Sequence, residues 1–71
     1  MDSFELANRL KEIRQARGFT QEALADQVGV TRQTIIAIEK SKFVPSVRLA
    51  LEIAAILALP LDQIFWLEKS S

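Results

Sequence analysis

Residues 20–40 have the sequence TQEALADQVGVTRQTIIAIEK, and this segment sets the organisation of the whole chain. Thr20 is a good helix N-cap, and the residues after it place small and apolar side chains on one helical face. Gly29 stands where a chain reversing between two helices needs positive φ. Thr31 caps a second helix that runs to about Lys40. The pattern predicts two short helices joined by a tight turn, which is a helix-turn-helix.

The second helix has two distinct arcs when its residues are placed at about 100° each. The side chains on the inward arc are mostly apolar or short. Those on the outward arc include long side chains with a positive charge or an amide group. In the major groove arginine can bond guanine bidentately and glutamine can bond adenine, and a recognition helix reads bases chiefly with its N-terminal residues. The candidate base-reading residues are therefore Arg32, Gln33, Ile36 and Ala37.

Two simpler interpretations stay open at this point. A polar helix face can be a solvated surface of a small bundle, although the complete turn pattern favours DNA reading. Ile36 can rest on a thymine methyl group or can be an isolated exposed apolar side chain, which is common. Ala37 can take the same role as Ile36 with less reach.

Four segments carry a family resemblance: QEALA at 21–25, GVTRQTI at 29–35, IE at 38–39 and PS at 45–46. Together they resemble the Cro/C1-type (XRE) helix-turn-helix regulators, from about Asn8 to Phe65. Within that family the chain is most similar to short stand-alone regulators of the cytolysin-repressor type. The resemblance implies a sequence-specific regulator that binds double-stranded DNA.

The phosphate contacts are expected at both ends of the helix-turn-helix. Gln21 begins a helix whose positive end can face a phosphate, and in the family the matching glutamine also supports the first base-reading side chain, here Arg32. Lys40 and Lys42 would contact phosphates without reading sequence. The full set of predicted phosphate-binding residues is Gln21, Thr31, Thr34, Lys40 and Lys42.

Glu39 falls on the inward arc, where an unpaired carboxylate would be costly. Arg14 on the first helix is the partner we expect, and the family resemblance points to the same inter-helix ion pair. The alternative is that Arg14 binds phosphate.

The chain is predicted to be one all-α domain, residues 1–71, with five helices. The first helix would begin between Ser3 and Ala7 and end at Arg17, unless residues 4–6 form an extended arm. The fourth, about 47–59, would face the core with Val47, Ala50, Ile53, Ala54 and Leu57. A short fifth helix would start at Pro60, and in similar short regulators residues 65–69 form a strand.

The C-terminal part is bulky and apolar, and exposed patches of this kind mark interaction sites. We expect residues 61–71 to form a dimerisation segment, with an interface made by Leu49, Ile56, Phe65, Trp66 and Leu67. A two-fold homodimer would place two recognition helices about 34 Å apart on a palindromic operator. The expected mechanism is repression by occlusion. The alternative is an antitoxin that contacts a toxin and regulates its own gene.

Composition narrows the function classes. The 71 residues contain no cysteine and no histidine, and neither a signal peptide nor an apolar run of membrane-spanning length is present. We therefore expect a cytoplasmic protein that is not an enzyme, with no cofactor, no metal, no evident small-molecule ligand and no membrane partner. The net charge is zero, but residues 9–48 contain eight basic and four acidic residues, a balance of +4. Local charge is what a phosphate backbone meets.

Overall fold

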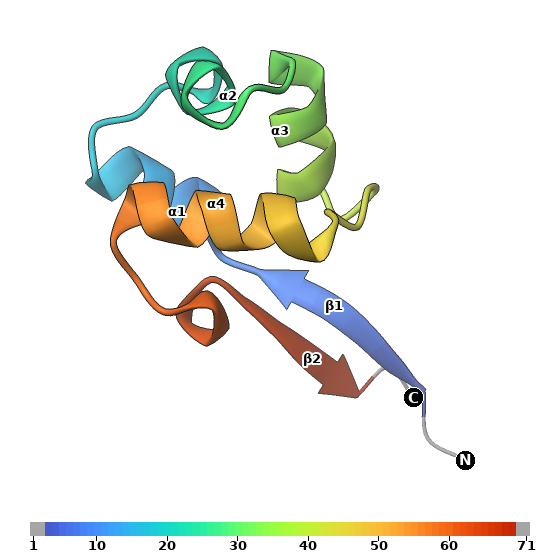
Figure 1. Cartoon of the computed structure of the whole chain (residues 1–71). Helices are drawn as coiled ribbons and strands as arrows, with labels where there is room; N and C mark the ends of the chain where they lie inside the picture. The colour runs from blue at the N-terminus through green and yellow to red at the C-terminus, as the bar shows by residue number, and fades with distance from the viewer. Residues whose placement is uncertain (1–2, 70–71) are drawn as a thin grey trace.

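The computed structural model describes residues 3–69, which form a helical body and a projecting two-stranded sheet (Figure 1). The elements follow in the order β1 (Phe4–Asn8), α1 (Leu10–Ala16), α2 (Gln21–Val28), α3 (Arg32–Glu39), α4 (Val47–Leu57), the 3-10 turn η1 (Leu61–Gln63) and β2 (Phe65–Lys69). The helix-turn-helix of residues 20–40 therefore consists of α2 and α3.

The core lies where α4 passes beneath the other helices. Its fully buried large side chains come from every helix and from the residue after η1: Leu10, Leu24, Ile35, Ile38, Ile53, Leu57 and Ile64. Full burial of such a side chain contributes about 1.5–3 kcal/mol. In α4 the buried face is Ala50, Ile53, Ala54 and Leu57, as expected, but Val47 is exposed. The core thus fixes α2 and α3 on α4 and leaves one side of α4 uncovered.

Side-chain caps define the starts of α2 and α3. The Thr20 hydroxyl accepts a hydrogen bond from the Ala23 N–H at 3.0 Å, and the Thr31 hydroxyl accepts one from the Thr34 N–H at 3.3 Å. Both residues have extended backbone angles, as N-caps do. These two caps confirm the helix starts that the sequence predicts.

The prediction of a five-helix all-α fold is wrong. The described residues form four α-helices and an antiparallel sheet of β1 and β2. The first helix begins only at Leu10, because residues 4–8 are extended, and the expected fifth helix is the single 3-10 turn η1. The extended alternatives for residues 4–6 and 65–69 are the ones that the structure adopts.

The sheet forms because the two ends of the chain supply each other's backbone partners. Phe4 lies opposite Lys69, Leu6 opposite Leu67, and Asn8 opposite Phe65. An isolated strand would leave its N–H and C=O groups without protein partners, and pairing satisfies them. Figure 1 shows the two strands running side by side away from the helices. The outermost part of the predicted dimerisation segment, residues 70–71, lies outside the described residues.

Candidate nucleic-acid interface

The turn between α2 and α3 depends on one backbone conformation. Gly29 ends α2 with φ 73°, in the left-handed region that glycine adopts without a Cβ penalty. The Val30 N–H donates to the Ala25 carbonyl at 3.0 Å and closes the turn. A Cβ at Gly29 would meet no atom within 4 Å, so the requirement for glycine comes from φ and not from crowding. The turn brings the start of α3 to the surface beside α2.

The outward arc of α3 presents the four candidate base readers unequally. Arg32 and Gln33 are exposed in the first turn, directly after the Thr31 cap. Ile36 and Ala37 are half-buried one turn later, whereas Ile35 and Ile38 on the other arc are fully buried. The two long polar side chains are thus the most accessible of the four.

The predicted phosphate-binding residues lie at both ends of this surface. Lys40 and Lys42 are exposed just after α3, and Thr31 is exposed at its start. Thr34 is half-buried, and its hydroxyl lies 3.1 Å from that of Thr31. Gln21 is half-buried at the start of α2.

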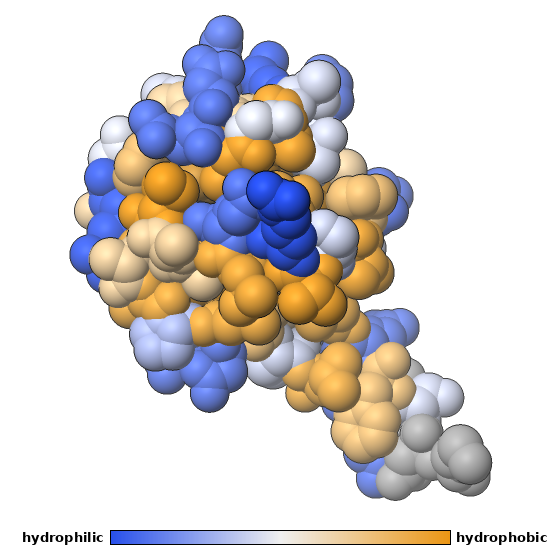
Figure 2. Space-filling view, viewed as in Figure 1, coloured by the Kyte–Doolittle hydropathy of each residue, from blue (hydrophilic) through white to orange (hydrophobic). Residues whose placement is uncertain are grey.

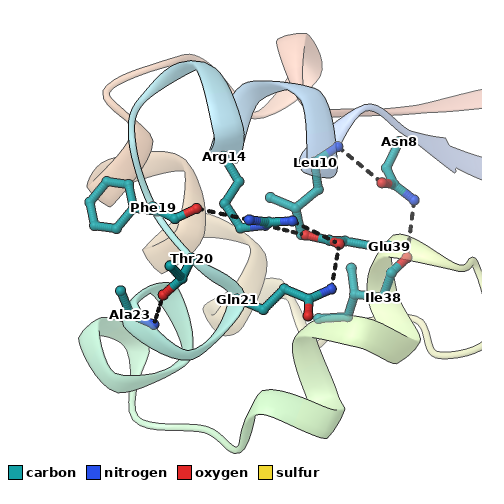
Figure 3. Close-up of polar contacts among 9 residues, drawn as sticks. All are labelled: Asn8, Leu10, Arg14, Phe19, Thr20, Gln21, Ala23, Ile38 and Glu39. Carbon is teal, nitrogen blue, oxygen red and sulfur yellow. Dashed lines mark hydrogen bonds and ion pairs between the residues drawn. The ribbon is translucent and has the colours of Figure 1, made fainter.

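A buried ion pair joins α1 to the end of α3 (Figure 3). Arg14 Nε donates to Glu39 Oε2 at 2.6 Å, and Nη2 approaches Oε1 at 3.4 Å. The two side chains are only 7% and 4% exposed. Arg14 Nη1 also donates to the Phe19 carbonyl at 2.8 Å, so all three guanidinium nitrogens make hydrogen bonds within the protein.

Gln21 extends this network to α2. Its Nε2 donates to Glu39 Oε1 at 3.1 Å, so one carboxylate receives hydrogen bonds from two different helices (Figure 3). This bond uses one of the two N–H groups of the Gln21 amide, and the second N–H remains as a donor for another contact. No buried side-chain nitrogen or oxygen among residues 3–69 lacks a hydrogen-bond partner.

Asn8 is a connecting residue that sequence reasoning missed. Its Nδ2 donates to the Ile38 carbonyl at 3.1 Å and lies 3.5 Å from the Ser41 hydroxyl, while its Oδ1 accepts from the Leu10 N–H at 3.0 Å (Figure 3). The side chain thus joins the end of β1, the start of α1 and the end of α3. An asparagine two residues before a helix is a sequence signal for the local bond to the Leu10 N–H. The bond to Ile38, 30 residues away, has no such signal.

The residues expected at a dimer interface are buried to different extents within one protomer. Phe65 is buried, and Leu49, Ile56 and Trp66 are half-buried. The Trp66 ring lies 5.3 Å from the Arg9 guanidinium carbon, and Trp66 Nε1 donates to Glu68 Oε1 at 3.0 Å. Only Leu67, at 66% exposure, is largely free of protomer contacts among these five side chains.

Other kinds of site find no support in residues 3–69. No pocket and no cluster of potential metal ligands is found in this part of the chain. None of its helices is long and apolar enough to cross a bilayer.

A family model described as helix-turn-helix matches residues 10–64, which covers α1 to the end of η1. The chain therefore belongs to the Cro/C1-type (XRE) helix-turn-helix family of DNA-binding transcriptional regulators.

Its relatives by sequence are regulators of the same kind. The chain is 46% identical to YgzD, an uncharacterised HTH-type transcriptional regulator of Bacillus subtilis, over 93% of this chain and all of that protein. It is 48% identical to an HTH-type transcriptional regulator of Methanocaldococcus jannaschii, over 84% of this chain and 91% of the relative.

Similar solved structures share the fold. The restriction-modification controller protein C.AhdI of Aeromonas hydrophila has a TM-score of 0.72 and 31% identity, covering 78% of this chain and 80% of its own. A proposed DNA-binding protein of Bacteroides fragilis has a TM-score of 0.79 and 26% identity, covering 86% of this chain and 98% of its own.

Proposed function

We propose that this protein is a homodimeric transcriptional repressor that binds a palindromic operator in double-stranded DNA. Each protomer inserts the outward arc of α3 into the major groove of one half-site. Bound across a promoter, the dimer blocks access to it, and this occlusion needs no effector pocket. Such a regulator works in the cytoplasm, on the chromosome.

The observation that carries this proposal is the exposed pair Arg32 and Gln33 on the first turn of a helix that is buried on its other side. Arg32 can donate two hydrogen bonds to guanine O6 and N7, and Gln33 can bond adenine N6 and N7. In this proposal Ile36 and Ala37, one turn further, contact thymine methyl groups. The name of the structural neighbour C.AhdI, a controller protein, fits the same regulatory role.

The phosphate contacts would come from the residues around this arc. Lys40 and Lys42 provide mobile positive charges at one end, and Thr31, Thr34 and Gln21 provide neutral donors at the other. Such contacts fix the register of the protein on the duplex, and sequence is read by the base contacts. The +4 balance of residues 9–48 supports attraction to the backbone although the whole chain is neutral.

The ion pair of Arg14 and Glu39 serves as a positioning device in this proposal. It ties the last residue of α3 to α1, and Gln21 adds α2. Because three helices share one buried carboxylate, the angle of α3 on the scaffold is fixed before DNA arrives. A preset recognition helix loses less conformational entropy on binding.

Selection of bound sites from a pool of random duplexes tests the proposal. The expected result is enrichment of a palindrome with half-site centres about ten base pairs apart. A pool that shows no enrichment above its salt-sensitive background would contradict the proposal. Co-purification of a second polypeptide from the native source, together with that result, would favour the antitoxin alternative.

A further inference from the structure

The uncovered side of α4 carries a row of apolar side chains, which we call the α4 row: Val47, Leu51 and Ala55. Val47 is 75% exposed and Leu51 is 52% exposed, and Ala55 is exposed as well. Phe43 and Val44, both exposed, extend the row into the loop before the helix. In Figure 2 hydrophobic residues lie around a strongly hydrophilic group on the face of the molecule where Figure 1 shows α4. A contiguous apolar surface of this kind marks an interaction site.

We propose that the α4 row is the two-fold contact with a second copy of this chain, packed antiparallel through Leu51. This inference rests on the proposed homodimer and assigns its surface. The members of the row are four residues apart, and rows of that spacing on two helices interdigitate in the commonest class of helix packing, with crossing near −50°. An axis through Leu51 places Val47 of each copy against Ala55 of the other.

Charge supports a second copy as the occupant. Arg48 and Glu52 form the neighbouring row, with Arg48 Nε 3.3 Å from Glu52 Oε1 and the side chains 88% and 45% exposed. Reversing the helix direction maps the position of Arg48 close to that of Glu52, so each arginine would face the carboxylate of the other copy. An isologous interface requires this self-complementarity, in which residue i contacts j and j contacts i.

The area that a stable dimer interface needs can be compared with the accessible surface of the chain. A stable interface takes about 800 Å² from each partner. That is about one sixth of the 4844 Å² accessible surface of the chain. Phe43 and Val44, exposed in the loop between α3 and α4, add apolar area to that of the α4 row.

Sedimentation of three proteins tests the assignment: wild type, Leu51→Glu, and the matched control Leu67→Glu, which changes a leucine on β2 that is 66% exposed against 52% for Leu51. Leu51→Glu should raise the dimer dissociation constant at least about 30-fold, the effect of a central interface residue worth 2 kcal/mol. Leu67→Glu should leave it within a few-fold of wild type. Both variants should keep the wild-type circular dichroism spectrum, because both positions are exposed.

The opposite pattern, a stable Leu51→Glu dimer or a dissociated Leu67→Glu variant, would overturn the α4 assignment while leaving the homodimer in place. A wild type that is monomeric both alone and on DNA would overturn the homodimer itself. The two failures are therefore distinguishable.

A mixing experiment tests the reciprocal contact. Arg48→Glu alone places two acids against two acids across the axis, and Glu52→Arg alone places two bases against two bases. Each variant should be monomeric where wild type is dimeric, whereas an equimolar mixture should restore dimers because both cross-axis pairs again have opposite charge. A mixture that stays monomeric would contradict the antiparallel arrangement.

Discussion

Replacing Glu39 by alanine should cost about 3–5 kcal/mol of unfolding free energy, because it leaves a buried charge without its partner. The carboxylate accepts from Arg14 Nε at 2.6 Å and from Gln21 Nε2 at 3.1 Å. Without it, the Arg14 guanidinium keeps its hydrogen bond to the Phe19 carbonyl in a site where the side chain is 7% exposed. A 71-residue domain has a total stability of about 4–11 kcal/mol, so this loss is a large fraction of it.

Urea unfolding followed by tryptophan fluorescence measures this loss, since Trp66 is the single tryptophan of the chain. With a slope of about 1 kcal/mol per molar urea, the midpoint should fall by about 3 M or more. Glu22→Ala, which removes an exposed acid from α2, is the matched control and should change stability by less than about 0.5 kcal/mol. A Glu39→Ala variant as stable as the Glu22→Ala control would refute the argument.

A double substitution separates stability from positioning. Arg14→Met combined with Glu39→Leu replaces the pair by apolar side chains, which often restores stability. If the pair also sets the angle of α3, the double variant should fold but bind the selected operator more weakly than wild type. Wild-type operator affinity in that stable variant would remove the positioning role.

Three further substitutions test one predicted phosphate contact and two structural features that hold the helices in place. Lys42→Ala should weaken binding to all DNA sequences alike and reduce the slope of log affinity against log salt by about 0.9, as loss of one phosphate contact does; a loss confined to the operator would show instead that Lys42 reads bases. Asn8→Asp keeps the acceptor for the Leu10 N–H but places a carboxylate against the Ile38 carbonyl, so urea unfolding should show a loss of about 1–3 kcal/mol; an unchanged midpoint would mean that the bond from β1 to α3 is dispensable. Gly29→Ala should cost about 1–2 kcal/mol, measured in the same way, because φ is 73° there; no loss would show that the turn can change its conformation.

The local part of the fold could be predicted because its signals are local. Thr20, Gly29 and Thr31 each act on the next few residues, so the caps and the turn between α2 and α3 follow from the sequence. The inward arc of α3 also follows from helical periodicity, which places Glu39 beside buried isoleucines. Its partner Arg14, 25 residues earlier, was expected because an inward carboxylate needs a positive charge and because the family resemblance points to this pair.

The terminal sheet could not be predicted in this way. Phe4 and Lys69 are register partners, and nothing in residues 3–9 alone specifies a strand 57 or more residues away. Without knowledge of that partner strand, the sequence pattern favours a first helix that begins between Ser3 and Ala7. The same pairing places the half-buried Leu6 against the core, together with Leu49 and Ile56 of α4. Leu49 and Ile56 are two of the residues predicted to meet a second copy, and their role at a dimer interface stays a prediction.

The sequence also did not predict which side of α4 is exposed. Val47 was expected in the core because it fits the apolar spacing of Ala50, Ile53, Ala54 and Leu57. In the structure it belongs to the row with Leu51 and Ala55, which faces away from the core. When a helix is apolar on most sides, periodicity alone does not tell which side the protomer covers.

The central claim is that the exposed start of α3 reads bases, and the affinity of Arg32→Ala for a systematic set of operator variants tests it most directly. Each base pair of a half-site is changed in turn, symmetrically, and binding of wild type and variant is compared at fixed salt. The variant should lose about 1–3 kcal/mol on the operator and lose its preference at one base pair of each half-site, while keeping the others. An equal loss on every sequence, with all base preferences unchanged, would contradict base reading by Arg32 and reduce its role to phosphate attraction.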